Sequence, residues 1–597
     1  MYFISMELKS YLKNLAHFIP LKKYFIRNRW AILAGLLSLL IVDFLQLIIP
    51  LVIKKAIDLL TTQIATSLIL LKYGLIILSI ASVIGLFRFI WRYLILGNAR
   101  RIEQSLRNEM YANLQTLPLS FYQKTNIGDL MARAINDVMA IRISCGMGLV
   151  ALIDGIVLGI AAVGFMVSIN WKLTLISLIP APIIITVTRI LTKRMSSGFE
   201  SVQKTFADLT ERVREAFAGI RVTKAYNREQ WEYQKIKQEG NRYISVNLKL
   251  SKSLALFFPL MAILTNISLV VVIGLGGRYT ISGNITTGDF VAFITYLNLL
   301  TWPMMAMGWV SNLVQRGSAS MRRINRILEE VSEIRDPAQS LEVSGIRGNI
   351  LIKGLWLRYS EQKEWALRDI NMELKAGDTA AIVGRVGSGK TTLLQALPRL
   401  LNIPAGTVFV GGNDIYQMPL KILRQNIGFA TQEAFIFSDT VRNNVIFGRE
   451  GISEKHLEMV LHAAGILEDI QGFENGLDTM LGERGITLSG GQRQRLTIAR
   501  AVLADPLILI LDDALSMVDT DTEEHILNQI LELRHDRTNL IVSHRVSTIS
   551  RASRIFVFEM GQVIEQGTHE ELLKLGGIYS ELYEEQLLDR ELEIGVS

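Results

Sequence analysis

The sequence is poor in cysteine, in charge and in clustered histidine. It holds one cysteine, Cys145, so an intrachain disulfide and a cysteine-based metal site are excluded. Its seven histidines are scattered, with no HExxH or other metal-ligand spacing. Only 20% of the residues are charged, whereas 50% are hydrophobic and the mean hydropathy is +0.30. A soluble chain would need more polar surface to cover its core, so this composition predicts residence in a membrane.

The positive charge is modest, at +7 for the whole chain. The sequence contains no basic patch interleaved with aromatic residues, so we expect no nucleic-acid partner. In a membrane protein such an excess is explained by Lys and Arg that gather on the cytoplasmic side. The first long apolar run starts near Trp30 and lacks a small-residue cleavage site, so we expect it to remain as a signal anchor.

The first half of the chain contains apolar segments of similar length. Each is close to the ~20 residues that cross a bilayer as a helix. Six such segments are predicted: Trp30–Ile53, Tyr73–Leu94, Gly146–Ile169, Leu173–Leu191, Leu254–Gly276 and Phe290–Val310. The links at 95–145 and 192–253 are long, basic and helical in periodicity. We therefore expect helices that continue into the cytosol, with both termini and both long links on the cytoplasmic side.

The pattern changes near Gly348, where short strands rich in Val, Ile and Leu alternate with turns and helices. Nearly all-apolar strands such as Leu507–Asp513 predict a buried parallel sheet in an α/β domain. The expected fold is thus a multi-domain membrane protein with a six-helix transmembrane domain followed by an α/β domain. Its predicted parts are an N-terminal cytoplasmic arm (1–29), the transmembrane domain (30–328), a linker (329–346), the α/β domain (347–583) and a C-terminal tail (584–597).

A glycine-rich loop follows the predicted strand Ala380–Val383. The loop and the first residues of the next helix are Gly384, Arg385, Val386, Gly387, Ser388, Gly389, Lys390, Thr391 and Thr392, which fit the P-loop pattern GxxxxGK[ST]. Backbone N–H groups of such a loop cradle phosphate oxygens at a helix N-terminus. Lys390 is expected to reach the β- and γ-phosphates, and the Thr391 hydroxyl to ligate Mg²⁺. The motif predicts that the chain binds ATP and Mg²⁺.

Two further motifs follow the P-loop. A second apolar strand ends in Asp512 and Asp513, and Asp512 is placed as the carboxylate that holds Mg²⁺ in P-loop ATPases. Between the loop and this strand, ahead of a basic helix, lie Leu488, Ser489, Gly490, Gly491 and Gln492. This LSGGQ stretch is the signature of ABC transporters, and the chain resembles that family from about Trp30 to Leu582. It resembles in particular a type I exporter half-transporter, in which a membrane domain is fused to one ABC ATPase domain.

The resemblance implies a site built from two chains. Ser489 and Gly491 would contact the γ-phosphate of an ATP held by a second half-transporter, so each site is complete only in a head-to-tail dimer. The resemblance also implies that the Tyr359 ring stacks on adenine and that Gln432 senses Mg²⁺ and the γ-phosphate. It further assigns a switch role to His544.

Other stretches resemble the connecting parts of such exporters. Ser516–Asp519 matches the D-loop, with Asp519 at its end, and Gly482–Gly485 matches the exporter X-loop. In the membrane half, the residues from Phe121 to Asp137 resemble the first coupling-helix region of such exporters. Glu215–Ala225 resembles their second long intracellular connection.

The residue after Asp512 departs from the family pattern. The family usually has glutamate there, taken as the general base for the attacking water, whereas this chain has Asp513. The carboxylate is withdrawn by roughly 1–1.5 Å, and a mispositioned base forfeits much of a factor of about 10²–10⁴. We expect weak catalysis at this chain's own P-loop, with Asp513, Gln432 and His544 as its catalytic residues. The intact signature would serve a different partner, so the chain resembles the MdlA-type subunit of bacterial heterodimeric multidrug exporters; a homodimer is the alternative.

Four charged residues lie within or near the predicted spans, where ionised groups are costly and often functional. They are Asp43, Arg88, Arg92 and Asp154. We expect an interhelical ion pair between Arg88 and Asp154, and an Asp43 carboxylate that faces the substrate cavity and attracts cations. The alternative is that these residues lie in water or serve packing.

The predicted function is ATP-driven, alternating-access export of hydrophobic or amphipathic small molecules, some of them cationic, across a bacterial plasma membrane. The expected partners are a second ABC half-transporter, membrane lipids and the transported molecule. A lipid or lipid-linked flippase shares the same architecture, and a nucleotide-gated regulator or channel subunit is the alternative from another class.

Overall fold

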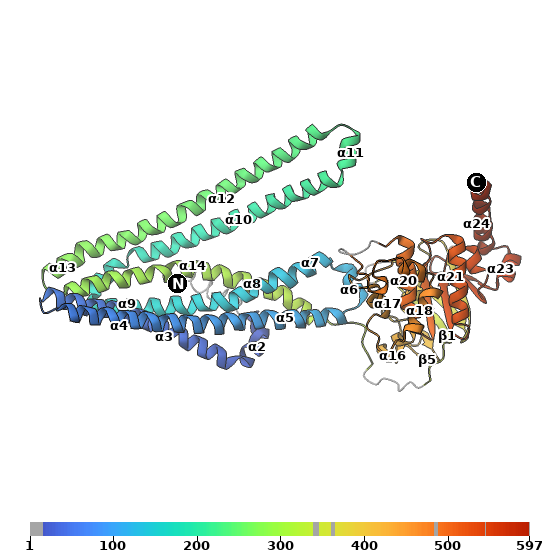
Figure 1. Ribbon diagram of the computed structural model, residues 1–597, viewed down its shortest axis with the longest axis horizontal. Helices are drawn as coiled ribbons and strands as arrows, with labels where there is room; N and C mark the ends of the chain where they lie inside the picture. Colours follow the sequence, from blue (N-terminus) through green and yellow to red (C-terminus); the bar gives the residue numbers. More distant parts are fainter. Residues whose placement is uncertain (1–15, 338–344, 360–363, 483–487, 544, 596–597) are drawn as a thin grey trace. The chain divides into compact units, whose positions relative to one another are not determined.

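The computed structural model describes residues 16–337, 345–359, 364–482, 488–543 and 545–595 of the chain (Figure 1). The chain divides into two compact units, which are described separately. The first comprises Met1–Thr116 and Thr125–Glu330, and the second Leu117–Lys124 and Val331–Ser597.

The first unit is built from long helices. Its elements are η1 (Ile19–Leu21), α2 (Lys22–Arg27), α3 (Arg29–Thr61), α4 (Ser67–Trp91), η2 (Arg92–Leu96), α5 (Gly97–Thr116), α7 (Ile127–Ala132), η3 (Arg133–Asp137), α8 (Val138–Ile143), η4 (Ser144–Gly148), α9 (Leu149–Ser177), α10 (Pro180–Ala218), α11 (Ile220–Ala225), α12 (Glu229–Val271), η5 (Val272–Gly276), α13 (Gly277–Ile281) and α14 (Thr287–Glu329). Successive elements join into continuous helical stretches at Ser67–Thr116, Ile127–Ser177 and Glu229–Ile281.

Five helical stretches in the described chain are long and apolar enough to cross a membrane. They are α3, Ser67–Thr116, Ile127–Ser177, Glu229–Ile281 and α14. The sequence predicted six spans. Six are not confirmed, because α10 is not among the five. The predicted fourth segment is split: Leu173–Ser177 belongs to the preceding stretch, and α10 starts only at Pro180.

The stretch that contains Leu173–Ser177 is itself broken, at Asn170. Asn170 has φ −159° and ψ 109°, which are not helical, and its side chain accepts a hydrogen bond from the Leu173 N–H at 3.0 Å. This is the arrangement of a helix N-cap. A new helical segment therefore starts directly after Ile169, at the boundary that the sequence predicted between the third and fourth apolar segments.

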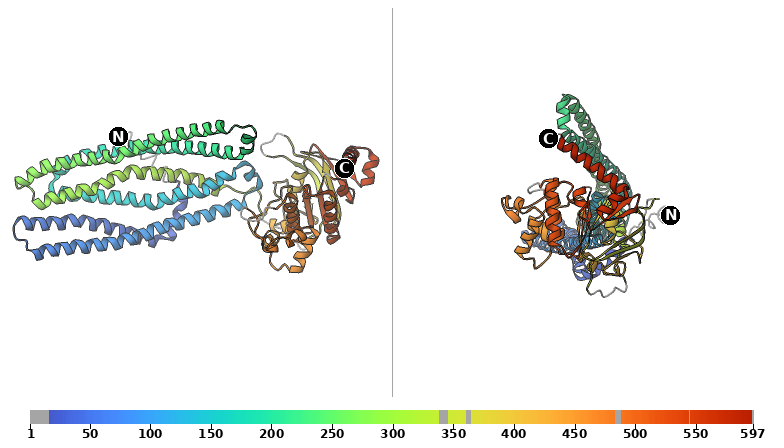
Figure 2. Two further views of the ribbon diagram at one scale, coloured as in Figure 1. Left: turned by 45° about the horizontal axis from the view of Figure 1, so that its top comes forward. Right: turned by 90° about the vertical axis from the view of Figure 1, so that its right-hand side faces the viewer.

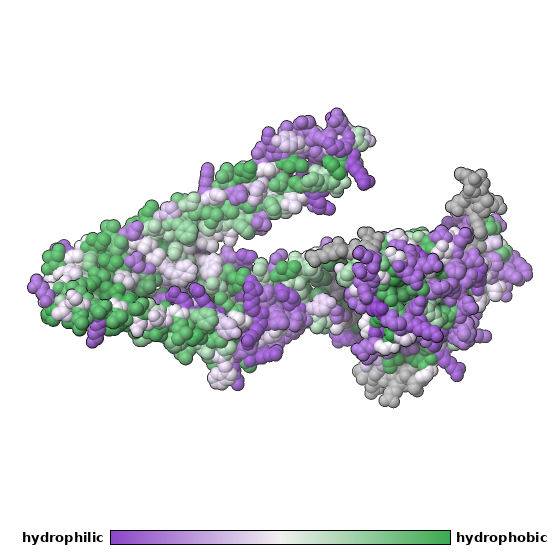
Figure 3. Space-filling view, in the orientation of Figure 1, coloured by the Kyte–Doolittle hydropathy of each residue, from purple (hydrophilic) through white to green (hydrophobic). Residues whose placement is uncertain are grey.

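The helices α10 and α12 pack along each other and are joined by α11 (Figures 1 and 2). Hydrophobic residues gather at the end of the unit that holds α13, and hydrophilic residues gather around α11 at the other end of this hairpin (Figure 3). The apolar end has the composition of a lipid-facing surface, since lipid tails require no polar partner.

The core of this unit lies where α14 crosses α3 and α9. The side chains of Phe293 and Tyr296 on α14 are fully buried there. Tyr296 stacks on Phe165 with ring centroids 5.4 Å apart, and its hydroxyl donates to the carbonyl of Leu47 at 2.8 Å. The hydrogen bond satisfies the one polar group of a buried tyrosine, so the aromatic contact can sit in an apolar core.

The second unit contains two sheets. Its elements are α6 (Leu119–Lys124), β1 (Ile350–Leu357), β2 (Leu367–Leu374), β3 (Thr379–Gly384), α15 (Lys390–Ala396), β4 (Val408–Val410), β5 (Asn413–Asp414), α16 (Leu420–Gln425), β6 (Ile427–Ala430), α17 (Val441–Ile446), α18 (Glu454–Ala463), α19 (Leu467–Gln471), η6 (Gly476–Asp478), α20 (Gly490–Val502), β7 (Ile508–Asp512), α21 (Thr520–Leu533), β8 (Thr538–Val542), α22 (Val546–Ile549), β9 (Arg554–Glu559), β10 (Gln562–Gly567), α23 (His569–Leu575) and α24 (Ile578–Gly595).

The larger sheet has the order β10-β9-β3-β8-β7-β6, and the smaller has the order β2-β1-β4-β5. In the larger sheet β9, β3, β8, β7 and β6 pair in parallel, and β10 closes the edge antiparallel to β9. The strand β7 is buried at every position, as the sequence of Leu507–Asp513 predicted, and β8 is buried at every position as well. Because parallel strands end at the same edge, the loop after β3 and the carboxylates after β7 meet there, with only β8 between them.

Candidate functional site

The P-loop leaves the end of β3 in a conformation that requires glycine. Gly389 has φ +103°, and a β-carbon there would lie 2.8 Å from the backbone oxygen of Ala366. The loop wraps around Lys390, whose ammonium group donates to the carbonyls of Gly384 at 2.7 Å and Arg385 at 3.0 Å. Burial lowers the pKa of Lys390, while the carboxylates after β7 oppose that change. The P-loop carbonyls therefore hold the Lys390 ammonium inside the same loop that would bind a phosphate.

Two oxygen-bearing side chains, Thr391 and Asp512, lie beside this lysine. The Thr391 hydroxyl donates to Oδ1 of Asp512 at 3.3 Å, which brings the start of α15 and the end of β7 together. Asp512 is only 3% exposed, and burial raises its pKa. The hydrogen bond from Thr391 and the charge of Lys390 oppose that rise, and the neighbouring Asp513 adds to it.

These residues fit Mg²⁺ held together with a nucleotide. A hydroxyl and a carboxylate are hard oxygen ligands, and Mg²⁺ is usually bound by one or two carboxylates with water and substrate phosphates. The Ser388 hydroxyl in the same loop is buried and has no hydrogen-bond partner, so the cradle holds a donor that nothing in the described chain uses. No group of three or more His, Cys, Asp or Glu that could hold a metal alone occurs among the described residues. The phosphates would complete the coordination.

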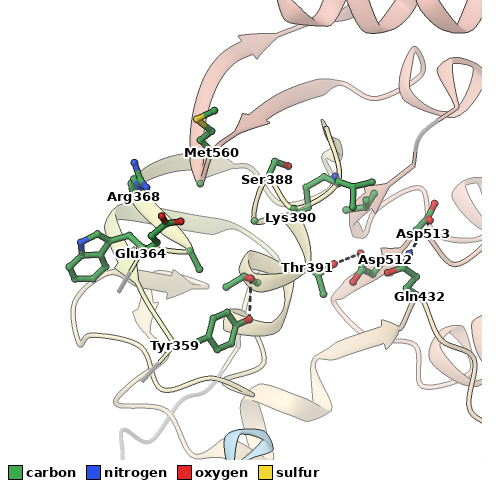
Figure 4. Close-up of a pocket in the computed structure, with 18 residues that line it drawn as sticks. Tyr359, Glu364, Arg368, Ser388, Lys390, Thr391, Gln432, Asp512, Asp513 and Met560 are labelled. Atoms are coloured by element: carbon green, nitrogen blue, oxygen red, sulfur yellow. Dashed lines mark hydrogen bonds between the residues drawn. The ribbon is translucent and has the colours of Figure 1, made fainter. Parts of the chain in front are cut away.

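These residues line a cavity of about 670 Å³. Figure 4 shows Tyr359 on one side of it and Asp512, Asp513 and Gln432 on the other. The complete lining is Tyr359, Glu364, Trp365, Ala366, Arg368, Val386, Gly387, Ser388, Gly389, Lys390, Thr391, Thr392, Gln432, Asp512, Asp513, Val542, Met560 and Gly561. The structure thus brings Tyr359, the P-loop, Gln432 and both aspartates into one pocket.

Tyr359 is tied to the helix that follows the P-loop. Its hydroxyl lies 3.1 Å from Oγ1 of Thr392, within hydrogen-bonding distance. Sequence reasoning missed Trp365, which lines the same cavity and meets Trp356 edge to face at 5.4 Å. It also missed Arg368 and Met560. A signal existed only for Trp365, an aromatic residue close to Tyr359 in the sequence.

Asp513 is held by its backbone. Its N–H donates to the carbonyl of Val542 at 3.0 Å, and its φ of +49° lies in the left-handed region that non-glycine residues seldom adopt. Its carboxylate accepts from Nε2 of Gln432 at 3.5 Å, the long limit of a hydrogen bond. The short side chain thus reaches only weakly toward Gln432.

The signature residues begin a helix. Ser489 is the N-cap of α20 and forms a capping box with Gln492, with hydrogen bonds of 3.0 and 3.2 Å. The glycines that follow lie against the D-loop, because a β-carbon at Gly491 would lie 3.1 Å from the backbone oxygen of Met517. Gln494, which sequence reasoning missed, joins the two by accepting from the Met517 N–H at 2.8 Å. Leu488, directly before the cap, is buried, and Gly490 opens the helix.

The D-loop ends at Asp519, which caps α21 by accepting from the Thr522 N–H at 2.9 Å. One turn later, the buried Glu523 accepts from Arg545 at 2.6 Å and from Thr548 at 2.7 Å. Burial raises the pKa of Glu523, and these donors oppose the rise. This anchor, also missed from the sequence, fixes the residue after His544; His544 itself and most of the predicted X-loop lie outside the described residues.

Asp43 lies in the first unit, on α3, and is 1% exposed. Its neighbours are Asp154 on α9 and Arg88 on α4. Neither Asp43 carboxylate oxygen has a hydrogen-bond partner in the described chain. The ion pair expected between Arg88 and Asp154 is not formed among the described residues; Asp154 instead accepts from Nε1 of Trp302 at 3.2 Å. Asp43 is thus buried between helices, and its predicted role toward substrates stays a prediction.

Known families match both units. Residues 32–304 match the ABC transporter transmembrane region, and residues 367–516 match the ABC transporter family. The probable multidrug resistance ABC transporter ATP-binding/permease protein YheI of Bacillus subtilis is 34% identical over 97% of this chain and 98% of its own. The multidrug resistance-like ATP-binding protein MdlA of Escherichia coli is 34% identical over 96% and 98%, respectively.

Two further likenesses extend the range of relatives. The ATP-dependent lipid A-core flippase of Syntrophus aciditrophicus is 36% identical over 83% of this chain and 82% of its own. The solved structure of a bacterial Atm1-family ABC exporter with ATP bound superposes with a TM-score of 0.75 at 25% identity, over 94% of this chain and 98% of the other. This chain therefore belongs to the ABC transporter family, as an exporter half-transporter whose ATPase domain binds ATP and couples its hydrolysis to transport across a membrane.

Proposed function

We propose that this chain is the weakened subunit of a heterodimeric exporter of hydrophobic or amphipathic small molecules. The observation that carries this proposal is Asp513. Every other part of the nucleotide pocket described above has the residue types that ATP and Mg²⁺ require, whereas the general-base position holds the shorter acid. Two relatives that match nearly the full chain, YheI and MdlA, are named as multidrug resistance proteins, which supports a multidrug-type substrate.

The remaining residues have separate tasks in this proposal. The Tyr359 ring stacks on adenine, and the P-loop N–H groups with Lys390 bind the phosphates. Thr391 and Asp512 hold Mg²⁺, which neutralises charge that develops on the phosphates. Gln432 orients water and the metal.

Three parts of the site act at its edge. His544 contacts the γ-phosphate, Asp519 lies at the dimer interface, and Asp513 accepts the proton of the attacking water, slowly because it is short.

The signature works on the partner's nucleotide. Ser489 is exposed at the N-terminus of the 13-residue helix α20, where unpaired N–H groups favour an anion. A partner that supplies its own P-loop and a glutamate would therefore have a competent site with this signature. A homodimer would instead contain two weakened sites, which is why we favour a heterodimer.

Transport follows from the dimer. ATP bound across both composite sites stabilises the closed pair of ATPase domains, and the coupling helices carry this closure into the membrane helices. ATP thus shifts the population toward the outward-open state by binding the two states unequally. Hydrolysis at the partner's site resets the cycle, while the weak site retains ATP longer.

The membrane topology belongs to the same proposal. Six spans, with the fourth formed by the residues after Asn170, would place both termini, the α5–α8 region and the α11 end of the hairpin in the cytoplasm of a bacterial cell. The polar surface around α11 supports this orientation (Figure 3). The division into arm, membrane domain, linker, ATPase domain and tail keeps the boundaries predicted from the sequence.

A lipid flippase is the second candidate. It is favoured by one observation, the 36% identity to a lipid A-core flippase, although that match covers less of the chain than the multidrug relatives do. A nucleotide-gated regulator is weaker, because the complete signature and pocket favour turnover.

The test is ATP turnover and transport in reconstituted vesicles. The chain is measured alone and with a half-transporter that has glutamate after its own Walker B aspartate, using fluorescent cationic dyes and labelled lipid as substrates. We expect a nearly inactive single chain and an active pair that moves the dye. A single chain that pumps as fast as the pair overturns the weak site, and movement of lipid alone overturns the multidrug substrate.

A further inference from the structure

Two acidic side chains meet inside the membrane domain without enough donors between them. Asp43 on α3 is 1% exposed, and both its carboxyl oxygens are buried without a hydrogen-bond partner in the described chain. The same three helices α3, α4 and α9 also form a buried apolar cluster, which includes Leu39, Val42 and Ile84. An ionised carboxylate in such a place is costly, because no water or donor replaces its hydration.

The second acid, Asp154, is a polar neighbour of the first. The carboxyls of Asp43 and Asp154 are near enough to hydrogen-bond, although both are acceptors when ionised. A hydrogen bond between them therefore exists only when one of them carries a proton. Asp154 has its own donor, since the Trp302 indole N–H reaches Oδ2 at 3.2 Å. Asp43 has none other than a proton shared with Asp154.

The charges around the pair also indicate one bound proton. Among the described residues, Asp154 from α9 and Arg88 from α4 are the charged groups that act on Asp43, and α14 contributes the neutral indole of Trp302. Two carboxylates and one guanidinium carry a net charge of −1. One added proton makes the cluster neutral and also supplies the missing hydrogen-bond donor.

We propose that Asp43 and Asp154 form an intramembrane site that binds one proton, shared between their two carboxyl groups. The proton comes from water, and binding converts one carboxylate to a carboxylic acid with no other change. Asp154 is partly exposed, so it provides the route by which the proton enters and leaves the buried Asp43. The site goes beyond the proposed export function and does not depend on which molecule is exported.

The test is infrared spectroscopy of the full chain in lipid nanodiscs at neutral pH. The C=O stretch of a protonated carboxylic acid is separate from the amide bands, shifts in D₂O, and shifts again with ¹³C-labelled aspartate. We expect one such aspartic acid band in the wild type. Absence of an aspartate-derived acid band overturns the proposal without any variant.

Three substitutions identify the residues by the charge count. Asp43→Asn and Asp154→Asn each leave one carboxylate beside Arg88, which is neutral without a proton, so both are expected to lose the band. Arg88→Gln leaves two carboxylates and no guanidinium, so the band is expected to persist. Asp208→Asn, at an exposed aspartate on α10, is the matched control and should keep it. Persistence of the band in both aspartate variants, or its loss in Arg88→Gln, contradicts the assignment.

A metal cation is the competing occupant of such a pair. Sodium replaces potassium at constant ionic strength, and the thermal unfolding temperature is recorded for the wild type and Asp154→Asn. We expect no sodium dependence in either. An unfolding temperature that rises with sodium in the wild type alone overturns the proton assignment. Because Asp154 is only partly buried, this comparison remains possible if Asp43→Asn does not fold.

Discussion

Restoring glutamate after the Walker B aspartate is expected to speed hydrolysis at this chain's own P-loop. The substitution Asp513→Glu extends the carboxylate by one methylene toward Gln432, from which it now accepts at 3.5 Å. The backbone cannot make up the missing length in the native protein, because the Asp513 N–H is bonded to Val542 at 3.0 Å and its φ is +49°. The full effect of the shorter side chain is therefore felt at the attacking water.

The size of the effect follows from this geometry. General-base catalysis contributes a factor of about 10²–10⁴, and a displacement of about 1 Å can cost about 10²-fold. We expect Asp513→Glu to raise turnover at this site by about 10- to 100-fold. In free energy this is about 1.4–2.8 kcal/mol of transition-state stabilisation, at 1.36 kcal/mol for each factor of ten. Asp513→Asn, which removes the base, should fall below the wild type.

The assay is phosphate release per P-loop from the purified chain in lipid vesicles, at saturating ATP and Mg²⁺. Asp536→Glu is the matched control, because it makes the same chemical change at an exposed position beside His535. An unchanged rate in Asp513→Glu, with a wild-type rate already equal to that of Glu-bearing half-transporters, would refute the weak-site reasoning. An equal gain in Asp536→Glu would show that the effect is not local.

Three other measurements probe the pocket and its support. Gly389→Ala places a β-carbon 2.8 Å from the Ala366 oxygen at φ +103°, and it should weaken nucleotide binding at least about tenfold. Gly387→Ala has open space around the new β-carbon, so it should cost only the ~1–2 kcal/mol of a left-handed backbone. Titration with a fluorescent nucleotide compares the two variants. Thr391→Ala should raise the Mg²⁺ concentration needed for half-maximal ATPase activity about tenfold, and EDTA should abolish activity in both proteins; equal Mg²⁺ dependence would contradict its role as a ligand. The folded-state pKa of Glu523 lies above its ordinary 4.5 because of burial, so its proton favours the native state, and its contribution to stability is lost as pH rises through that pKa; thermal unfolding of Glu523→Gln should lack this part of the pH dependence.

Local patterns predicted much of the nucleotide site from the sequence. The P-loop, the strand that ends in Asp512 and the signature at Ser489 each combine a backbone shape with nearby residues, so a short stretch contains most of the information. The topology of a parallel sheet then brings their ends to one edge, whatever the length of chain between them. Tyr359 and Gln432, inferred only from resemblance, line the same cavity as the P-loop.

Contacts between different elements could not be predicted from the sequence. Glu523 gave no signal, because its partner Arg545 is on another element and only the folded domain brings them together. For the same reason, depth along two helices suggested that Arg88 pairs with Asp154, whereas helix rotation decides the contact and turns Asp43 toward both. The fourth apolar segment is interrupted between Ser177 and Pro180, and its hydropathy, which is apolar on both sides, did not mark this break.

In the proposed dimer, the link through Gln494 would make this ATPase domain respond to the nucleotide on its partner. Gln494 lies on the signature helix, yet its side chain holds the Met517 N–H, four residues after Asp513 in the same turn-rich segment. In the proposed dimer, a nucleotide on the partner would pull on α20 and, through this one amide, on the segment that positions this chain's own base. Since such coupling is reciprocal in free energy, the slow site would sense the fast one as strongly as the fast one senses it. A site that hydrolyses poorly would therefore still change how tightly the other site binds its nucleotide.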